Sequence, residues 1–343
     1  DGIRDIGVTG VQTCALPISP RPLDIFNNFF VHALQACAEN IRVVEPSSCE
    51  VLFYGPFGQE HRRYRHCLKI FYTGENILPD FNQCHASLSF SSDDFSGRNM
   101  RLPLWHLYID WFGVRSYGNP EWLVPVDWLK YPALCEFSAS SKQKFCAIVY
   151  GKQIQTRVTA IAAISRYRQV DVFGKANPRA PIPDGELAKL QALSPYRFSL
   201  CYENSIAEGY HTEKLLHGKI AGGIPIYFGH SSVDLDFNPR CFIQAADLSE
   251  HQLVERVREI DSDQRLYQQM VEEPLFLQFP DLGNLCEKLL SFILNQSNTE
   301  LPCNRPLPFH CARFQHSSSE ALLAAKKKVK HSLASLHLLR NKD

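Results

Sequence analysis

The sequence predicts an α/β protein of two domains, and three observations support this fold class. The chain has 343 residues, which is long enough for two domains of ordinary size, each with its own core. In the second half, short continuous apolar runs alternate with helical patterns, an order typical of a parallel sheet with helices on both faces. The halves meet at the polar stretch FSASSKQ, 137–143, which we interpret as the domain boundary.

The first stretch of the chain, DGIRDIGVTGVQTCALPIS, is left out of the predicted fold. It has neither the basic start nor the long apolar centre of a signal peptide, and Asp1 and Asp5 argue against one. The stretch resembles the translated read-through of a sequencing adapter. We therefore expect residues 1–19 to be a non-native leader, so the printed sequence carries no information about an N-terminal anchor.

The first domain is predicted to span residues 20–137. It opens with the helical pattern IFNNFFVHALQACAEN, and three apolar runs then predict buried strands: CEVLFYGP, CLKIFYTGEN and ASLSFSS. Residues 101–132 are dense in Trp, Tyr and Pro and have no clear period. We interpret this stretch as a packed aromatic connection, and a platform that stacks sugar rings is the alternative.

The second domain is predicted to span residues 138–300. Its elements are, in order, the strand FCAIVY, the helix QTRVTAIAAISRYR, the strands VDVFG and YRFSLCYEN, the helix TEKLLHGKIAG, the strands IPIYFG and CFIQAADL, and the helix SEHQLVERVREI. Ser249 and Gln252 form a capping box at the start of the last helix. No G-x-G-x-x-G fingerprint is present, which argues against a dinucleotide-dependent oxidoreductase.

The tail, residues 301–343, is predicted to carry a basic amphipathic helix. One helical face collects four apolar residues and four lysines lie largely elsewhere: Leu322, Val329, Leu333 and Leu336, and Lys326, Lys327, Lys328 and Lys330. We expect residues 317–340 to attach to anionic membrane surfaces, and a helix packed on the body is the alternative. No apolar run of the sequence is long enough to span a bilayer.

Charge and cysteine content narrow the classes of partner. The formal net charge is zero, so the sequence gives no electrostatic reason to expect a nucleic-acid partner. The twelve cysteines are scattered, with no C-x-x-C pair and no spacing typical of zinc sites. We expect buried free thiols in a reducing compartment, and a set of disulfides is the alternative.

The start of the helix at Thr212 predicts a site for an anion. The N–H groups of a helix start favour an anion, so a lysine in the first turn is locally unfavourable. Lys214 is therefore either a solvated surface lysine or shares an anionic ligand, such as a phosphate, with the helix start. Ligands of open α/β sheets bind at the carboxyl ends of strands. That edge gathers Asn204, Tyr210, Glu213 and Lys214, and Arg157 opens the helix after the domain's first strand. Together they predict a diphosphate site that needs no metal.

These motifs resemble the signature of the α-1,3/4-fucosyltransferases. In that family a strand ends in Glu-Asn and is followed by Tyr-x-Thr-Glu-Lys and a Gly-rich turn, as in YENSIAEGYHTEKLLHGKIAGG here. IPIYFGHSSVDLDFNPRCFI is similar to the bacterial branch, and KIFYTGENILPDF and MRLPLW are similar to the N-terminal motifs. The resemblance covers about residues 50 to 280. The chain departs from the family in its acidic loop SFSSDDFSG and lacks the C-terminal heptad repeats of some bacterial members.

The resemblance implies a fold and a reaction. The fold is of the GT-B type, with two Rossmann-like domains that face a central cleft: the acceptor binds to the first and GDP-L-fucose to the second. The reaction is an inverting transfer of L-fucose from GDP-β-L-fucose, in α-1,3 or α-1,4 linkage, to the GlcNAc of Galβ-GlcNAc (LacNAc-type) acceptors, as in Lewis antigens and lipopolysaccharide O-antigens. No cofactor or metal is required, although a divalent cation could stimulate turnover.

The resemblance also implies residue roles. Glu75 matches the general base, and Glu213 matches a second catalytic carboxylate close to the fucose. Arg157 and Lys214 match the residues that hold the diphosphate, and Asn204, Tyr210 and Glu213 match those around the nucleotide sugar. We interpret the two aspartates of VDLD, Asp234 and Asp236, as turn or capping residues rather than metal ligands.

Two alternatives stay open at this stage. One is a glycosyltransferase of the same fold with another acceptor, and the other is a non-catalytic protein that binds a sugar nucleotide or a glycan. We expect a cytoplasmic protein that is peripheral on the inner membrane face. If an anchor precedes the printed sequence, the Golgi lumen is the alternative.

Overall fold

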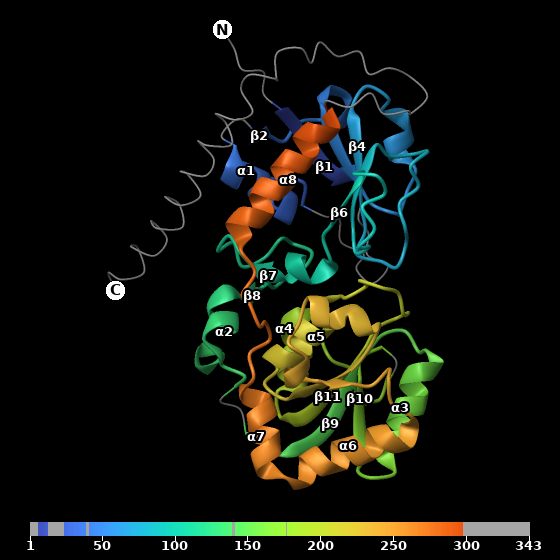
Figure 1. The fold of residues 1–343 in the computed structure, drawn as a ribbon, viewed down its shortest axis with the longest axis vertical. Helices are drawn as coiled ribbons and strands as arrows, with labels where there is room; N and C mark the ends of the chain where they lie inside the picture. The colour runs from blue at the N-terminus through green and yellow to red at the C-terminus, as the bar shows by residue number, and fades with distance from the viewer. Residues whose placement is uncertain (1–5, 13–23, 39–40, 139–140, 176, 298–343) are drawn as a thin grey trace, which may run out of the picture.

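The computed structural model describes residues 6–12, 24–38, 41–138, 141–175 and 177–297. They form two α/β domains that lie one above the other along the longest axis, with a smaller connection between them (Figure 1). All strand pairs of the described residues are parallel. The predicted α/β architecture with two domains is therefore confirmed.

Two predictions concern membranes. The basic tail helix and its membrane attachment lie outside the described residues and stay predictions. In the part of the chain that is described, no helix combines the length and the apolar character that crossing a bilayer requires.

The first domain is built on a six-stranded sheet in the order β2-β1-β3-β4-β5-β6. Its strands are β1 (Ile6–Gln12), β2 (Ile41–Arg42), β3 (Val51–Tyr54), β4 (Leu68–Tyr72), β5 (Ala86–Ser89) and β6 (Asn99–Arg101). Helix α1 (Phe29–Cys37) begins after Asn28, whose side chain accepts hydrogen bonds from the N–H groups of Phe30 and Val31. This cap satisfies two of the donors that a helix start leaves unpaired.

Strand β1 comes from the segment that the sequence prediction left out of the fold. It lies between β2 and β3, where Ile6 pairs with Ile41 and Val8 with Val51. Its β-branched residues Val8, Thr9 and Val11 favour extended backbone, whereas the prediction of a leader considered only the composition of the segment. Leaving these residues out of the fold was wrong, whereas their interpretation as a non-native leader is untested.

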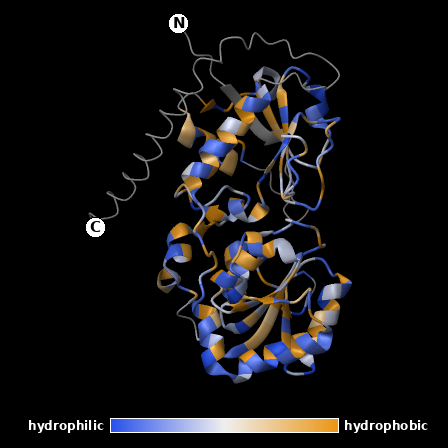
Figure 2. Cartoon of the chain, viewed as in Figure 1, coloured by the Kyte–Doolittle hydropathy of each residue, from blue (hydrophilic) through white to orange (hydrophobic). Residues whose placement is uncertain are grey.

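The second domain is built on a five-stranded sheet in the order β10-β9-β11-β12-β13. Its strands are β9 (Lys144–Val149), β10 (Val170–Phe173), β11 (Tyr196–Tyr202), β12 (Ile224–Phe228) and β13 (Ile243–Gln244), and its helices are α3 (Gln155–Ser165), α4 (Glu186–Leu193), α5 (Glu213–Ile220), α6 (Glu250–Ser262) and α7 (Gln264–Glu272). The strands are mainly hydrophobic, and the outer helices carry hydrophilic and hydrophobic residues in turn (Figure 2). The capping box of Ser249 and Gln252 is present. All predicted elements of this domain exist, and α4 and α7 are additional.

Helix α8 (Leu282–Ser297) returns to the first domain. It packs beside α1 (Figure 1), and the Gln296 Nε2 donates a hydrogen bond of 2.8 Å to the Gly97 oxygen. Its buried face holds Cys286, Leu289 and Ile293 at helical spacing. The predicted boundary of the second domain at 300 is therefore wrong for this helix, because its apolar face is buried by a partner distant in sequence.

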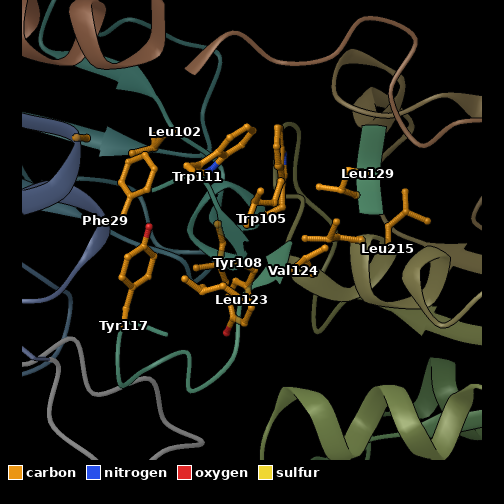
Figure 3. Packing of buried hydrophobic residues seen from close by; sticks show 14 of the residues in the cluster. Phe29, Leu102, Trp105, Tyr108, Trp111, Tyr117, Leu123, Val124, Leu129 and Leu215 are labelled. Carbon is orange, nitrogen blue, oxygen red and sulfur yellow. The ribbon is translucent and has the colours of Figure 1, made fainter. Parts of the chain in front are cut away.

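The connection between the domains is a packed aromatic cluster. It contains η3 (Leu104–Tyr108), β7 (Ile109–Asp110), β8 (Val124–Pro125) and α2 (Val126–Lys130). Trp105, Tyr108, Trp111 and Tyr117 are buried there. Figure 3 shows the cluster extending from Phe29, Trp111 and Tyr117 on one side to Leu129 and Leu215 on the other. These four aromatic rings are core residues, which confirms the packed connection rather than a sugar-stacking platform.

Candidate active site

The loops that follow β4 and β11 meet between the two domains. Glu75 and Asn76 follow β4, and Glu203 and Ser205 follow β11. The Asn76 Nδ2 donates a hydrogen bond of 2.9 Å to the Ser205 Oγ. Ligands of open α/β sheets bind at the carboxyl ends of strands, so we take this meeting point as the candidate active site.

Glu203 lies at the centre of the site and is only 1% exposed. Its carboxylate accepts hydrogen bonds from the Thr212 N–H at 2.9 Å, from the Thr212 hydroxyl at 2.8 Å and from the Lys214 Nζ at 3.0 Å. Thr212 is the N-cap residue of α5, but its side chain makes no cap hydrogen bond to the helix. The carboxylate of Glu203 therefore ties the start of α5 to the end of β11.

This arrangement changes the explanation for the lysine at the helix start. Sequence reasoning expected an external diphosphate to offset the charge of Lys214, whereas the structure provides a buried anion, Glu203, from the same domain. Burial alone would lower the pKa of Lys214, but Glu203 and Glu213 outweigh it and raise the pKa. The lysine is thus charged and fixed in position before any ligand binds.

Glu213, the first residue of α5, is an ionised carboxylate with two cationic neighbours. Its Oε1 lies 3.5 Å from the Lys189 Nζ and 3.9 Å from the Lys214 Nζ. Burial would raise the pKa of Glu213, but Lys214 and Lys189 outweigh it and hold the pKa far below its usual range. Its position at a helix start favours the anion further. Lys189 of α4 was not among the predicted site residues.

Arg157 and Asn204 are in direct contact, as their common sheet edge predicted. The Arg157 Nη2 donates to the Asn204 Oδ1 at 2.9 Å and to the Tyr202 oxygen at 2.6 Å, and its Nη1 donates to the Lys152 oxygen at 2.8 Å. The side chain is buried, and its guanidinium lies over the ring of Tyr150. Arg157 therefore presents a pre-positioned charge rather than a mobile one.

Tyr210 is part of the domain contact. Its buried ring meets Phe90 of the first domain edge to face, with 5.3 Å between the ring centroids. The preceding Gly209 has a φ of +75°, and a Cβ there would lie 2.3 Å from the Phe90 oxygen. Glycine is thus required where the loop passes the first domain. Tyr210 lies beside the predicted donor site, but its ring packs against protein.

Glu75 is the one predicted site residue from the first domain. Its N–H donates a 3.0 Å hydrogen bond to the Thr73 hydroxyl, which closes a local turn after β4. Burial is the main cause that raises the pKa of Glu75; Lys214 opposes it, while Glu213 and Glu203 add to it. The carboxylate of the first domain therefore senses the charges of the second domain.

A second charge network joins the domains beside the site. The Arg101 guanidinium at the end of β6 donates to both carboxylate oxygens of Asp236, at 2.8 and 2.7 Å. The Nδ1 of the buried His211 also bonds Asp236. Burial would raise the pKa of Asp236, but the bonds from Arg101 and His211 outweigh it and hold the pKa well below its usual range.

Sequence reasoning missed or misassigned several of these residues. Asp236 is a capping residue as predicted, because it is the C-cap of η5 (Ser231–Leu235), but its carboxylate also pairs with a cation of the other domain, which was not predicted. Asp234, by contrast, is an exposed residue of the first turn of η5 (Ser231–Leu235). Glu203 is part of the motif YEN, but it was given no role. The signal in the sequence was an acidic residue directly after an apolar strand, and the structure shows that this residue is buried. Within the described residues, the cluster with metal-ligand spacing lies elsewhere, at Cys49, His66 and Cys67.

Solved structures identify the fold. A crystal structure of alpha1,3-fucosyltransferase matches this chain with a TM-score of 0.64 at 21% identity and covers 89% of this chain and 93% of that chain. A second one, with GDP-fucose, has a TM-score of 0.61 at 21% identity, with 86% and 90% coverage. At this identity the likeness establishes the fold. It is the GT-B arrangement of glycosyltransferases, with two Rossmann-like domains.

The family follows from two family models. One, the alpha-(1,3)-fucosyltransferase FucT N-terminal domain, matches residues 21–108, and the other, the C-terminal model of glycosyltransferase family 10 (fucosyltransferase), matches residues 139–272. Together they match more than half of the chain, which therefore belongs to this fucosyltransferase family. Glu75 falls within the first match, and the five predicted donor-site residues fall within the second.

Curated relatives agree with this assignment. A putative fucosyltransferase of Acanthamoeba polyphaga mimivirus is 34% identical over 153 residues, which are 41% of this chain and 25% of the relative. The alpha-(1,3)-fucosyltransferase FucT of Helicobacter pylori is 27% identical over 261 residues, which are 66% of this chain and 52% of the relative. The chain thus spans from a quarter to about half the length of these relatives.

Proposed function

We propose that this protein transfers L-fucose from GDP-β-L-fucose to the GlcNAc of a Galβ-GlcNAc acceptor, in α-1,3 or α-1,4 linkage and with inversion. The observation that carries the proposal is the contact of the loops after β4 and β11, where Asn76 donates a 2.9 Å hydrogen bond to Ser205. There Glu75 of one domain comes near Lys214 and Glu213 of the other. A transfer between two bound sugars needs a base on the acceptor side and fixed positive charge on the donor side. The fucosyltransferase family supplies the identity of the sugar.

The donor side is suited to a diphosphate. Arg157 and Lys214 provide two fixed cations, and the start of α5 adds N–H groups that favour an anion. The diphosphate would share Lys214 with Glu203 rather than meet an unpaired lysine. This shared charge keeps the cation in place, and we expect the site to bind GDP without a metal ion.

The proposed reaction is a single displacement at the fucose C1 carbon. The acceptor oxygen attacks C1 and its proton passes to the Glu75 carboxylate, while the bond from C1 to the GDP oxygen breaks and GDP leaves with the electron pair. A raised pKa suits this role, because a base is most effective when its pKa approaches the working pH. Glu213, held ionised by Lys214 and Lys189, would stabilise the oxocarbenium-like transition state.

The test is direct. The purified chain is incubated with GDP-fucose and either LacNAc or its Galβ1,3-GlcNAc isomer, with and without EDTA, and the product linkage is assigned by NMR. We expect an α-fucosyl product when GDP-fucose and an acceptor are both present, with EDTA as well as without it. A β-linked product would contradict inversion, transfer only to other glycans would change the acceptor, and GDP-fucose binding without transfer would favour a non-catalytic binding protein. Loss of transfer in EDTA would overturn metal independence.

A further inference from the structure

Three residues with metal-binding side chains meet at the amino-terminal edge of the first-domain sheet. Cys49 lies two positions before β3, and His66 and Cys67 directly precede β4. Strands β3 and β4 pair in parallel with Val51 opposite Leu68, so both segments reach the same edge. The two sulfur atoms and an imidazole nitrogen all lie within 4.8 Å of one another.

The surroundings of this cluster separate an inner and an outer side. Cys49 is 2% exposed and Cys67 is fully buried, whereas His66 is exposed. Leu52 packs with the two cysteines, and Val44 and Tyr64 cover them further. The thiols thus lie in an apolar environment, and the imidazole faces solvent. Two thiolates and one imidazole are the ligand types that zinc prefers over magnesium or calcium.

We propose that Cys49, His66 and Cys67 bind one Zn²⁺ ion, with a water molecule as the fourth ligand on the solvent side. Ligands of a tetrahedral zinc ion lie roughly 3.5 Å apart, so atoms that lie within 4.8 Å of one another need to approach by little more than an ångström at most. Binding would release two thiol protons: Zn²⁺ replaces the proton on each sulfur, and no electrons are transferred. The ion would link the start of β3 to the start of β4.

The metal-free state of the cluster is consistent with such an exchange. The Cys49 thiol donates a hydrogen bond to the Pro46 oxygen at 3.3 Å. Contact with the Cys49 thiol and burial raise the pKa of Cys67, and Lys69 partly opposes them. Zinc binds cysteine as the thiolate, so each thiol would lose its proton on binding. A disulfide between the same two cysteines is the competing outcome.

This site would be separate from the proposed fucosyl transfer. Cys67 precedes β4 and Glu75 follows it, so the five-residue strand, about 17 Å long at 3.3 Å per residue, lies between them. The role we assign to the ion is structural, because it would tie the start of β3 to the start of β4 and so close the segment 49–67, which contains β3 and the loop after it. Its test therefore needs no measurement of transfer.

The experiment measures metal content and cobalt spectra of the full chain. The protein is purified under reducing conditions, supplied with zinc, dialysed, and analysed by mass spectrometry for metals. We expect about one zinc per chain in the wild type and in Cys84→Ser, a buried-thiol control from the same domain. We expect no bound zinc in Cys67→Ser and at least tenfold weaker zinc binding in His66→Ala. The side chain of His66 is exposed, so its removal should leave the fold intact and test the ligand alone. Co²⁺ alone should give a thiolate-to-metal charge-transfer band that Cys67→Ser abolishes.

Three results would overturn the proposal. One is a wild-type protein with reduced thiols and no bound zinc. Another is a Cys49–Cys67 disulfide, found by peptide mapping in protein that was never exposed to an added oxidant. The third is zinc that remains at full content in both Cys67→Ser and His66→Ala, which would place the metal elsewhere on the chain.

Discussion

Two charged clusters hold the same loop, and they differ in the sequence distance between their members. Glu203 and Lys214 are eleven positions apart and belong to one domain, with Thr212 between them. Arg101 and Asp236 are 135 positions apart and belong to different domains, with His211 completing the group. The first cluster can form as soon as the second domain folds, whereas the second requires the two domains to be in contact.

The buried carboxylates of these two clusters have different structural roles. Glu203 fixes a cation at the start of a helix, where the cation would otherwise be unfavourable. Asp236 fixes the position of one domain against the other. Removing one partner of such a pair is costly because the other charge stays buried without compensation. The predicted cost therefore depends on how completely the remaining partner is buried.

The largest effect is expected for Glu203→Gln. Lys214 is 19% exposed and would lose its buried anion, so the free energy of unfolding should fall by about 3–5 kcal/mol, the usual range for breaking a buried pair. Urea unfolding measures this. Glu208→Gln, an exposed carboxylate of the same loop, should stay within about 0.5 kcal/mol of the wild type. The double variant Glu203→Gln, Lys214→Met should recover part of the loss; unchanged unfolding in Glu203→Gln would contradict the assignment.

The next effect concerns Glu75 of the first domain, whose pKa is influenced by Lys214 and Glu203 of the second domain. Glu75→Gln should reduce fucosyl transfer roughly 100-fold or more and leave GDP affinity unchanged, because it removes the proton acceptor only. Since burial raises the pKa of Glu75, the wild-type rate should fall with decreasing pH at values above the usual glutamate pKa of about 4.3. This acid limb should be absent in the variant.

The first domain also provides a matched control for Glu75→Gln. Asp94 is an exposed carboxylate in the loop after β5, and Asp94→Asn should transfer fucose at the wild-type rate. Rates of transfer and calorimetric GDP titrations on both variants decide the question. If Asp94→Asn is the inactive variant and Glu75→Gln is active, the assignment of the base is wrong.

A smaller effect is expected for Asp236→Asn, because Arg101 is 24% exposed and remains partly hydrated. The loss of charge-assisted hydrogen bonds should lower the unfolding free energy by about 1.5–3 kcal/mol. The pKa of Asp236 is lowered in the folded protein, so its contribution is present above its unfolded pKa of about 3.9 and is lost as the pH falls through the folded value. The variant should therefore lose less stability in acid.

The neighbouring aspartate tests whether this effect is specific. Asp234 lies in η5, the short helix that Asp236 caps, and is exposed, so Asp234→Asn should match the wild type in stability and in acid response. Equal behaviour of the two variants in urea unfolding at pH 7 and pH 3 would show that the bond between Arg101 and Asp236 contributes nothing in solution.

The sequence predicted what depends on local pattern and missed what depends on contact between distant segments. The strands and helices of the second domain follow from apolar runs and capping residues, and Arg157 and Asn204 meet because parallel strands end at one edge. Helix α8 has a clear apolar face, but no local pattern shows that this face packs on α1. Asp236 caps a short helix, as its local sequence predicts, but no local pattern shows that Arg101 of the other domain binds its carboxylate.

The smallest effect is expected at the contact between domains that involves no charge. Asn76 and Ser205 share one hydrogen bond in an exposed setting, where such a bond contributes at most about 0.5–1.5 kcal/mol. Asn76→Ala and Ser205→Ala should each lower the kcat/KM of transfer by about twofold. In a double-mutant cycle the paired variant should be no worse than either single one, because the bond can be lost only once. Asn82→Ala, whose side chain bonds only locally to Asp80, serves as the control for the asparagine change. Additive losses would show that the two loops do not meet during turnover, and the charged pair of Arg101 and Asp236 would then carry the domain contact beside the site.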